Sequence, residues 1–345
     1  MITSLTVNNF TAFSNAEIEL SPGLNVLIGK NSTGKSHLLK LMYALCAAKP
    51  TPAALDEDNL SDLLTRKLFG VFKPEKKIGR LCREGQQKAE VLASFDPDIT
   101  VAFAFPSNMK EIVVTHESNF STYKLVPVFL PPKEMLSSFP GFSSLYLQRE
   151  ISTDETYFDL CQALETPPLR DNLNEVQIAV LDKLESACGG EFVLMKQKQF
   201  YYKPKDGQML EVDLAAEGFR KLGMLQRLVQ NGRVNPGVSG PLFWDEPEAN
   251  LNPSILKLLV DSLMTMCRAG QQVILSTHDY VTLKWIDLLR QDDDQVRFHA
   301  LYPGEDGVTI HSTGDYERIE PNAIDDAYAE LVDADVRRSM GGLGQ

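Results

Sequence analysis

Two short segments of the chain carry residue types suited to phosphate and metal-ion chemistry. The first follows an apolar run and opens a helical pattern, and it reads Gly29-Lys30-Asn31-Ser32-Thr33-Gly34-Lys35-Ser36. Glycines allow the backbone to wrap around an anion, and the free N–H groups of a helix start attract it. In this spacing we expect Lys35 to reach the β- and γ-phosphates of a nucleotide and Ser36 to ligate Mg²⁺. The alternative is a chance glycine-rich turn.

The second segment delivers two carboxylates from the end of an apolar run, in Leu242-Phe243-Trp244-Asp245-Glu246. Ligands of parallel sheets collect at the carboxyl ends of the strands. We expect Asp245 to hold Mg²⁺ through water and Glu246 to accept a proton from an attacking water as a general base. Alone, such a pair is also typical of a solvated acidic turn, so the assignment depends on its combination with the phosphate loop.

A histidine follows the next apolar run, in Leu275-Ser276-Thr277-His278. At the tip of a neighbouring strand its imidazole would lie beside the γ-phosphate, which makes it a candidate catalytic residue. The alternative is a buried structural histidine.

Hydrophobic patterning predicts the elements that position these residues. The N-terminal part predicts strands over 2–7, 16–20 and 24–28 and a helix over 35–48 that ends before Pro50 and Pro52. The C-terminal part alternates strands over 242–244, 273–276 and 296–301 with helices over 253–266 and around Trp285. This alternation predicts a parallel sheet flanked by helices.

The middle of the chain has a different character. Short connections predict antiparallel strands over 91–95, 99–105, 111–116 and 123–130, and a mostly helical stretch follows over 133–190. Asp206-Gly207 predicts a hairpin turn between strands at 192–202 and 209–214, and a helix is expected over 218–229. We therefore divide the chain into 1–60, with the phosphate loop; 61–132, basic and then β-rich; 133–204, mostly helical; 205–303, with the carboxylates and His278; and an acidic C-terminal segment, 304–345.

Composition limits the class of protein. The chain has 345 residues, 43% of them hydrophobic, which suits one large domain with an inserted lobe. The net charge of −13 argues against a protein that coats DNA generally. The five scattered cysteines do not suggest a disulfide framework, and no apolar run approaches the ~18 residues of a membrane helix. We expect a soluble cytoplasmic protein without a membrane partner.

The motifs together resemble the ABC-type ATPase heads of the RecF, SMC/Rad50 and OLD-nuclease group. Gly29–Ser36 resembles the Walker A loop, Leu242–Glu246 the Walker B strand, Asn250-Leu251-Asn252-Pro253 the D-loop, and His278 the switch histidine. The resemblance covers roughly 1–50 and 205–300. It implies an α/β P-loop NTPase fold of the ABC-ATPase head type, with an antiparallel β subdomain and an inserted helical lobe, that hydrolyses ATP with Mg²⁺.

The signature element departs from the family pattern. Ala216-Glu217-Gly218 stands where these heads carry Ser-x-Gly, so Gly218 matches and Ala216 replaces the serine. In such heads this element contacts the ATP of the opposite subunit, which implies a homo-oligomer built through ATP-sandwiched heads. Without the hydroxyl, turnover or dimerisation is expected to be weak, as suits a slow switch.

Two functions follow from the resemblance. In the first, the protein resembles the compact ATPases of bacterial anti-phage defence modules and controls a separate nuclease or other effector. In the second, it is a RecF-like repair or recombination ATPase that clamps DNA directly. The basic segment 66–88 favours DNA, although a solvated loop explains its charge equally well.

Overall fold

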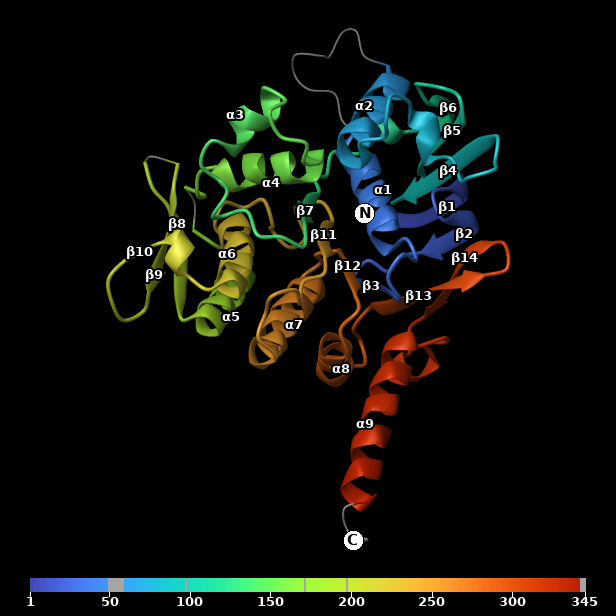
Figure 1. Cartoon of the computed structure of the whole chain (residues 1–345). Coiled ribbons are helices and arrows are strands. Elements are labelled where there is room, and N and C mark those ends of the chain that lie inside the picture. The colour runs from blue at the N-terminus through green and yellow to red at the C-terminus, as the bar shows by residue number, and fades with distance from the viewer. Residues whose placement is uncertain (49–58, 97, 171, 197, 342–345) are drawn as a thin grey trace.

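The computed structural model describes residues 1–48, 59–96, 98–170, 172–196 and 198–341. The helix break expected at Pro50 and Pro52 lies outside these residues. Two large sheets and a helical lobe make up the body, and one long helix projects from it (Figure 1).

A six-stranded sheet forms the centre of the molecule. Its order is β14 (Gly307–Thr313), β13 (Val296–Gly304), β3 (Leu24–Gly29), β12 (Val273–Thr277), β11 (Leu242–Asp245) and β7 (Val128–Leu130). All neighbours are parallel except β13 and β14. The parallel sheet expected from the alternating pattern is confirmed. The expected boundary between 303 and 304 falls in the β13–β14 hairpin.

The second sheet is antiparallel. It has the order β2 (Phe13–Glu19), β1 (Ile2–Phe10), β4 (Lys88–Phe95), β5 (Ile99–Pro106) and β6 (Val113–Ser118). The expected antiparallel strand over 123–130 is wrong, because only Val128–Leu130 forms a strand and it pairs in parallel with β11. All three of its residues are buried, as is typical of a parallel strand covered on both faces.

Helix α1 (Lys35–Ala47) lies between the two sheets, and other helices cover the far face of the parallel sheet. These are α5 (Glu175–Cys188), α6 (Glu217–Gln230), α7 (Pro253–Arg268) and α8 (Tyr280–Leu289). Strand β3 contributes to both cores, since Leu27 joins the cluster around α1 while Val26 and Ile28 join the other. This alternation follows the two-residue period of a strand and makes β3 the central support of the phosphate loop.

A lobe at the left of Figure 1 contains α3 (Phe142–Leu147), α4 (Glu155–Glu165) and the sheet β10-β9-β8 (Leu210–Glu211, Phe200–Pro204, Gly190–Leu194). Helix α2 (Leu60–Phe72) packs instead with α1 and the antiparallel sheet, and short 3-10 turns lie at 78–81, 120–122, 212–214 and 316–318. Helix α2 was not expected; its apolar side buries Leu64, Leu68 and Val71 beneath the basic residues. The strand expected over 192–202 is divided into β8 and β9 by a turn in which the N–H of Met195 donates to the carbonyl of Gln199 at 2.9 Å.

The hairpin expected at Asp206-Gly207 is confirmed as the β9–β10 connection. No disulfide joins the five cysteines, all of which lie in the described ranges. No helix in the described ranges is long and apolar enough to cross a membrane.

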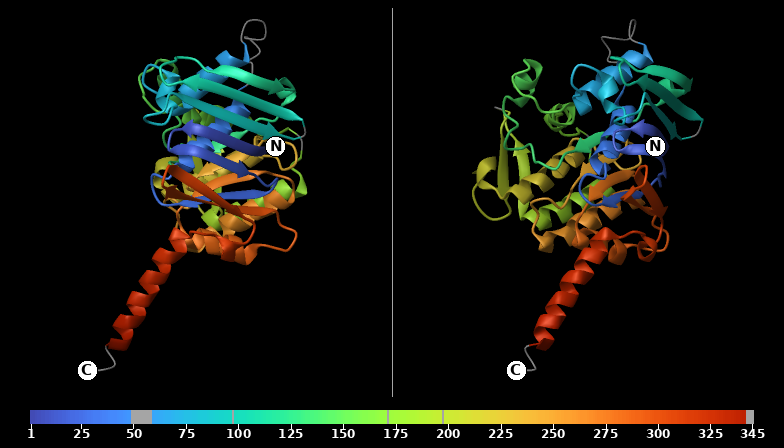
Figure 2. Two further views of the ribbon diagram at one scale, coloured as in Figure 1. Left: turned by 90° about the vertical axis from the view of Figure 1, so that its right-hand side faces the viewer. Right: turned by 45° about the vertical axis from the view of Figure 1, so that its right-hand side comes forward.

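Helix α9 (Ala323–Gly341) extends away from the body in each ribbon view (Figures 1 and 2).

Candidate nucleotide-binding and hydrolysis site

The loop between β3 and α1 has the backbone of an anion cradle. Gly29, Ser32 and Gly34 have positive φ angles of 150°, 66° and 86°. Two are glycines, which adopt this region readily, and Ser32 accepts a strain of ~1 kcal/mol or more. Gly34 precedes α1 without a capping side chain, so the N–H groups of the first helical turn are directed at the loop. These groups and the helix dipole suit a phosphate chain.

Lys35 lies inside this loop with 7% of its surface exposed. Its Nζ donates to the carbonyl of Gly29 at 2.7 Å and to that of Lys30 at 3.0 Å. Burial lowers the pKa of Lys35, against the opposing attraction of Glu246, Asp245 and Glu248. A desolvated cation beside three carboxylates and a ring of N–H groups is well suited to the β- and γ-phosphates.

The expected metal ligands meet at the sheet edge. The Ser36 hydroxyl donates to Oδ1 of Asp245 at 3.1 Å. Asp245 is 4% exposed and also accepts a short hydrogen bond from the Ser276 hydroxyl. Ser276 was not expected to take part, although its position two residues before His278 on the adjacent strand is a usable signal. The structure thus brings a hydroxyl and a fixed carboxylate together at the start of α1.

Glu246 and His278 face each other from the ends of β11 and β12. Nδ1 of His278 lies 3.3 Å from Oε1 of Glu246 and 3.8 Å from Oε1 of Glu248. Both Glu246 and His278 are partly exposed, at 32% and 49% of their side chains. Glu246 has a positive φ of 50°, and its N–H donates to the carbonyl of Ser276 at 3.1 Å. The arrangement leaves a carboxylate and an imidazole open to solvent at the mouth of the loop.

Glu248 supports this pair from beneath. Its Oε1 accepts from the Thr277 hydroxyl at 2.7 Å and from the N–H of His278 at 3.2 Å. Burial raises the pKa of Glu248 despite these bonds, while its Oε2 has no hydrogen-bond partner among the described residues. Sequence reasoning missed Glu248, which the repeated acidic residue in Asp245-Glu246-Pro247-Glu248 would have suggested.

A buried lysine holds the turn that carries Glu246. Lys221 is 1% exposed, and its Nζ donates a short bond to the carbonyl of Glu246 and a 3.3 Å bond to that of Ala249. Burial lowers the pKa of Lys221 to about 8. Because Lys221 belongs to α6, this contact joins α6 to the turn that carries Glu246. Its place beside Arg220 in a mixed stretch of the sequence gave no sign of such a role.

The signature element contacts the D-loop of its own chain. Oε1 of Glu217 accepts from Asn250 Nδ2 at 2.8 Å. A side chain at Gly218 would lie 2.7 Å from the carbonyl of Asn250, so this close packing requires glycine. Ala216 precedes α6 without a capping hydrogen bond. The contacts thus explain Gly218 within one chain, and the role expected for Ala216, Glu217 and Gly218 at another chain's nucleotide stays a prediction.

These residues fit a nucleotide with a divalent cation. The cradle supplies N–H donors and Lys35 for phosphates, and Ser36 with Asp245 supplies the oxygen ligands that Mg²⁺ prefers. Among the described residues, no group of three or more His, Cys, Asp or Glu side chains is arranged to hold a metal ion.

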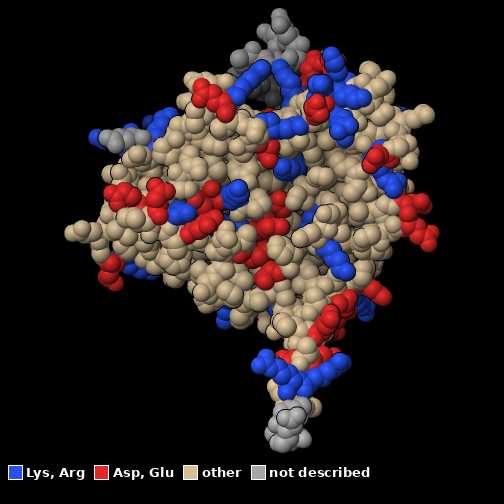
Figure 3. Space-filling model, viewed as in Figure 1, with Lys and Arg blue, Asp and Glu red and all other residues tan. Residues whose placement is uncertain are grey.

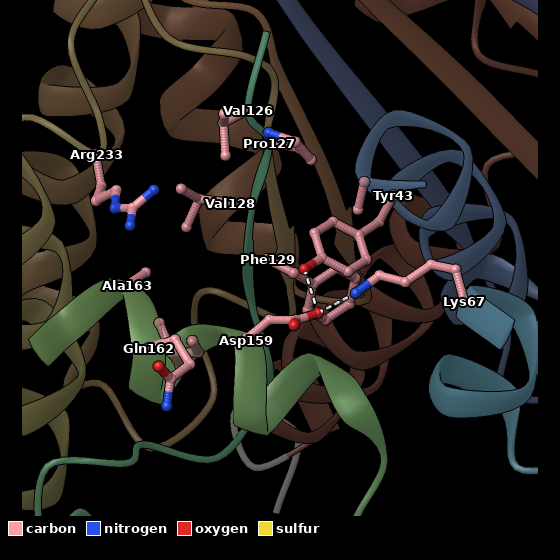
Figure 4. A pocket seen from close by; sticks show the side chains of 12 residues that line it. Tyr43, Lys67, Val126, Pro127, Val128, Phe129, Asp159, Gln162, Ala163 and Arg233 are labelled. Carbon is pink, nitrogen blue, oxygen red and sulfur yellow. Dashed lines mark hydrogen bonds and ion pairs between the residues drawn. The ribbon is translucent and has the colours of Figure 1, made fainter. Parts of the chain in front are cut away.

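A separate cavity of about 190 Å³ lies where α1 and α2 meet α4 (Figure 4). Tyr43 and Lys67 both point at Asp159, with hydroxyl and ammonium each 2.6 Å from Oδ2. Lys67 also donates to Glu155 at 2.7 Å. Burial alone would lower the pKa of Lys67, but Asp159 and Glu155 raise it overall. One residue of the basic segment is therefore used in joining the lobe to the head.

Comparison with known proteins agrees with this geometry. The family model described as "AAA ATPase domain" matches residues 1–136, and the one described as "AAA domain, putative AbiEii toxin, Type IV TA system" matches 115–284. The DNA replication and repair protein RecF of Listeria monocytogenes serotype 4b is 27% identical over 156 residues, 43% of this chain and 36% of that protein. RecF of Limosilactobacillus reuteri is 23% identical over 215 residues, 57% and 52% of the two chains. The chain thus spans about half or less of these relatives.

Solved structures share the fold at low sequence identity. The SMC head domain from Thermotoga maritima is 14% identical with a TM-score of 0.52, over 91% of this chain and 99% of that one. An Smc head bound to the C-winged helix domain of ScpA is also 14% identical, with a TM-score of 0.58, over 90% and 97% of the two chains. Fold, motifs and family matches together show that the chain is an ABC-type ATPase head of the RecF and SMC group.

Proposed function

We propose that the chain binds ATP with Mg²⁺ at the loop Gly29–Ser36 and hydrolyses it, with Glu246 as general base and His278 as its partner. The observation that carries this proposal is the pair Glu246–His278, 3.3 Å apart at the mouth of the phosphate loop. A general base must lie within hydrogen-bond reach of the water it activates. The exposure of Glu246 permits that water, and the held backbone of its turn fixes the carboxylate.

Each group has a distinct part in the reaction. The Glu246 carboxylate takes a proton from the water that attacks the γ-phosphate. The His278 imidazole, beside it, orients that water and the phosphate oxygens. Lys35 neutralises charge on the phosphates, and Ser36 with Asp245 would hold Mg²⁺, which supplies further charge neutralisation when bound.

A second copy completes the site in this proposal. Ala216, Glu217 and Gly218 of one head close over the ATP of another, and the D-loop contact of Glu217 with Asn250 orients them. The N-terminus of α6 then supplies N–H donors, while Ala216 supplies no hydroxyl. Turnover is accordingly slow, and ATP acts mainly to join the heads.

The biological role that fits such a switch is control of a separate effector in the cytoplasm. We propose a nuclease effector in an anti-phage defence system. The match to a family described as a putative toxin of a Type IV toxin–antitoxin system supports a two-component arrangement. In pull-downs of the tagged protein with and without ATP, identified by mass spectrometry, the proposal requires a nuclease or toxin among the bound proteins. Recovery of DNA-repair proteins alone would contradict it.

The variant Glu246→Gln tests the catalytic proposal. The amide keeps the shape of the carboxylate and lacks its basic oxygen. We expect ATP affinity within about threefold of the wild type, loss of at least ~100-fold in turnover, as for a lost general base, and an ATP-dependent mass increase by light scattering. Lys35→Ala is the matched control, since it should abolish ATP binding and therefore the mass increase. Wild-type turnover in Glu246→Gln would remove Glu246 from the mechanism.

A DNA clamp is the second candidate function. The RecF relatives are described as DNA replication and repair proteins. In Figure 3 lysines and arginines gather at the top of the molecule. Lys73 and Arg149 also line one pocket together. Each lost phosphate contact should reduce the salt dependence of binding by about one unit of slope.

Charge reversal separates the two candidates. The test variant changes Lys73, Lys76, Lys77 and Arg80 to Glu, and the control reverses Lys196, Lys203 and Lys205 on the three-stranded sheet. A DNA clamp requires that only the first variant lose affinity for duplex DNA at low salt. Absence of DNA binding by the wild-type protein would eliminate this candidate.

A further inference from the structure

Helix α9 carries an apolar row that is largely exposed along the described chain. Tyr328, Val332, Val336 and Met340 recur every four residues and are 41%, 43%, 43% and 68% exposed, and the adjoining Leu331 is 63% exposed. Residues four apart form one ridge of a helix, the ridge that most often packs against another helix. In Figures 1 and 2 the helix stands clear of the body along this stretch.

The first turns of α9 are firmly attached to the head. The Tyr316 hydroxyl donates to Oδ1 of Asp325 at 2.5 Å, and Ile324 packs against the main core. The Tyr328 ring stacks on Tyr280 with centroids 3.8 Å apart and planes 8° apart. These contacts set the direction in which α9 leaves the head, so the exposed row belongs to a rigidly mounted arm.

The arm leaves from the face that carries the nucleotide site. An open cleft of about 480 Å³ is lined by Gly29–Asn31 of the phosphate loop, by His278 and Tyr280, and by Ala327, Tyr328 and Leu331 of α9. Any second head that approached this loop would meet α9 first. The position of the helix therefore favours another copy of this chain as its partner.

We propose that α9 pairs antiparallel with α9 of a second copy of this chain, in a register centred on Val332. In this register the row matches itself, because Tyr328 lies opposite the partner's Val336 and Val332 opposite the partner's Val332. A row with equal four-residue spacing on both sides of its centre is self-complementary about a twofold axis.

Charge selects the antiparallel direction. The head end of α9 carries Asp325 and Asp326, and its far end carries Arg337 and Arg338. In the antiparallel direction the acidic end of each helix lies along the basic end of its partner, although Asp326 and Arg338 lie about 120° around the helix from Val332 and do not face the partner directly. A parallel pair would instead set acid against acid and arginine against arginine, which is repulsive. The same acidic residues disfavour an anionic membrane surface as the partner.

The pairing acts without nucleotide and has a consequence for the heads. Two copies tethered through α9 meet at a high effective concentration, so ATP binding closes heads that are already associated. The raised local concentration allows the signature element to contact the ATP of the partner head, even though Ala216 replaces the serine.

Cysteine cross-linking of the full chain without nucleotide tests the register. Val332→Cys faces its own copy across the axis, at the separation that a disulfide needs, whereas Met340→Cys lies ~24 Å away along the helix from the partner's Met340. Under mild oxidation with copper phenanthroline, we expect a covalent dimer from Val332→Cys, little from Met340→Cys, and none from the wild-type chain with its own cysteines. Dimers from both variants would establish a parallel pair and overturn the proposal, as would dimers from neither.

Sedimentation in the Lys35→Ala background measures the association free of any ATP effect. We expect Val332→Asp to weaken self-association at least 100-fold, whereas Arg338→Glu, at a position about 120° around the helix from Val332, should weaken it less than about threefold. A monomeric parent protein, or equal losses in the two variants, refutes the pairing. Because these measurements exclude ATP, they stand or fall separately from the ATP-driven closure tested by Glu246→Gln.

Discussion

Replacing Lys221 by methionine separates positioning of the catalytic turn from nucleotide binding. Methionine preserves most of the volume and apolar contact of the lysine but removes both hydrogen bonds, to the carbonyls of Glu246 and Ala249. Glu246 depends on this support because it holds a φ of 50°, which is unfavourable for a residue with a side chain. Once its carbonyl is released, the turn is expected to relax and displace the carboxylate.

The size of the effect follows from the two bonds. A hydrogen bond from a charged donor contributes about 1.5–3 kcal/mol. We take the lower value, because the bond to Ala249 is long and burial already lowers the pKa of Lys221 to about 8. Because methionine also removes the cost of burying the ammonium, the unfolding free energy should change by less than about 1.5 kcal/mol. A carboxylate displaced by ~1 Å reduces catalysis by up to ~100-fold, so kcat should fall ~10- to 100-fold.

The assay combines phosphate release, ATP calorimetry and denaturant unfolding. We expect the kcat loss with ATP affinity within about threefold of the wild type, since Lys221 contacts neither the phosphate loop nor Ser36. Lys257→Met is the matched control, because that lysine lies on α7 over the Trp285 ring, away from the turn. Unchanged kcat in Lys221→Met would refute the positioning role. Equal losses of affinity and kcat would show that the whole head is disrupted instead.

Three further outcomes are expected. As pH rises through about 8, the Lys221 ammonium loses its proton in the folded chain but keeps it in the unfolded chain to about 10.5. The unfolded state then binds more protons, so this group increases the free energy of unfolding as the pH rises. Turnover should fall over the same range, because the ammonium that holds the turn is lost. In a profile of kcat from pH 7 to 10, Lys221→Arg should move this fall in kcat to higher pH. Ala216→Ser should raise kcat or ATP-dependent dimerisation about tenfold, because the serine hydroxyl adds one charge-assisted hydrogen bond. Phosphate release measures kcat, and light scattering measures dimerisation. If both are unchanged, residue 216 does not contact the nucleotide. Lys67→Met removes the cation that pairs with Glu155 and Asp159, and it should lower the free energy of unfolding by about 2–3 kcal/mol after discounting for the partial exposure of both acids. The control Lys88→Met breaks only the exposed pair with Glu90 and should cost under ~1 kcal/mol in the same denaturant unfolding. Equal costs in the two variants would refute the structural role of Lys67.

Local sequence signals were sufficient for the phosphate loop and for the elements beside it. The apolar run 24–28, the glycines and the helical pattern after Lys35 all describe neighbouring residues, and the structure has β3, the loop and α1 as expected. The carboxylates and His278 were also found, because each follows a buried strand directly. Parallel strands bring such positions to one edge by simple topology.

Errors arose where distant residues decide the outcome. Val128–Leu130 pairs with β11, more than a hundred residues away, and nothing in its own sequence distinguishes it from an antiparallel strand. The sequence left the basic segment 66–88 open as a DNA-binding surface or a solvated loop, and it could not show that α2 turns Lys67 toward two acids of α4.

The sequence by itself therefore determined the chemistry of the nucleotide loop, because that chemistry belongs to residues close together in the chain. Only the tertiary structure decided what supports it. Glu248 and Lys221 act through buried contacts with the turns at 246–249 and 277–278, and burial depends on packing between elements. Likewise, only the fold shows that one face of α9, in the acidic C-terminal segment, is exposed beside the phosphate loop.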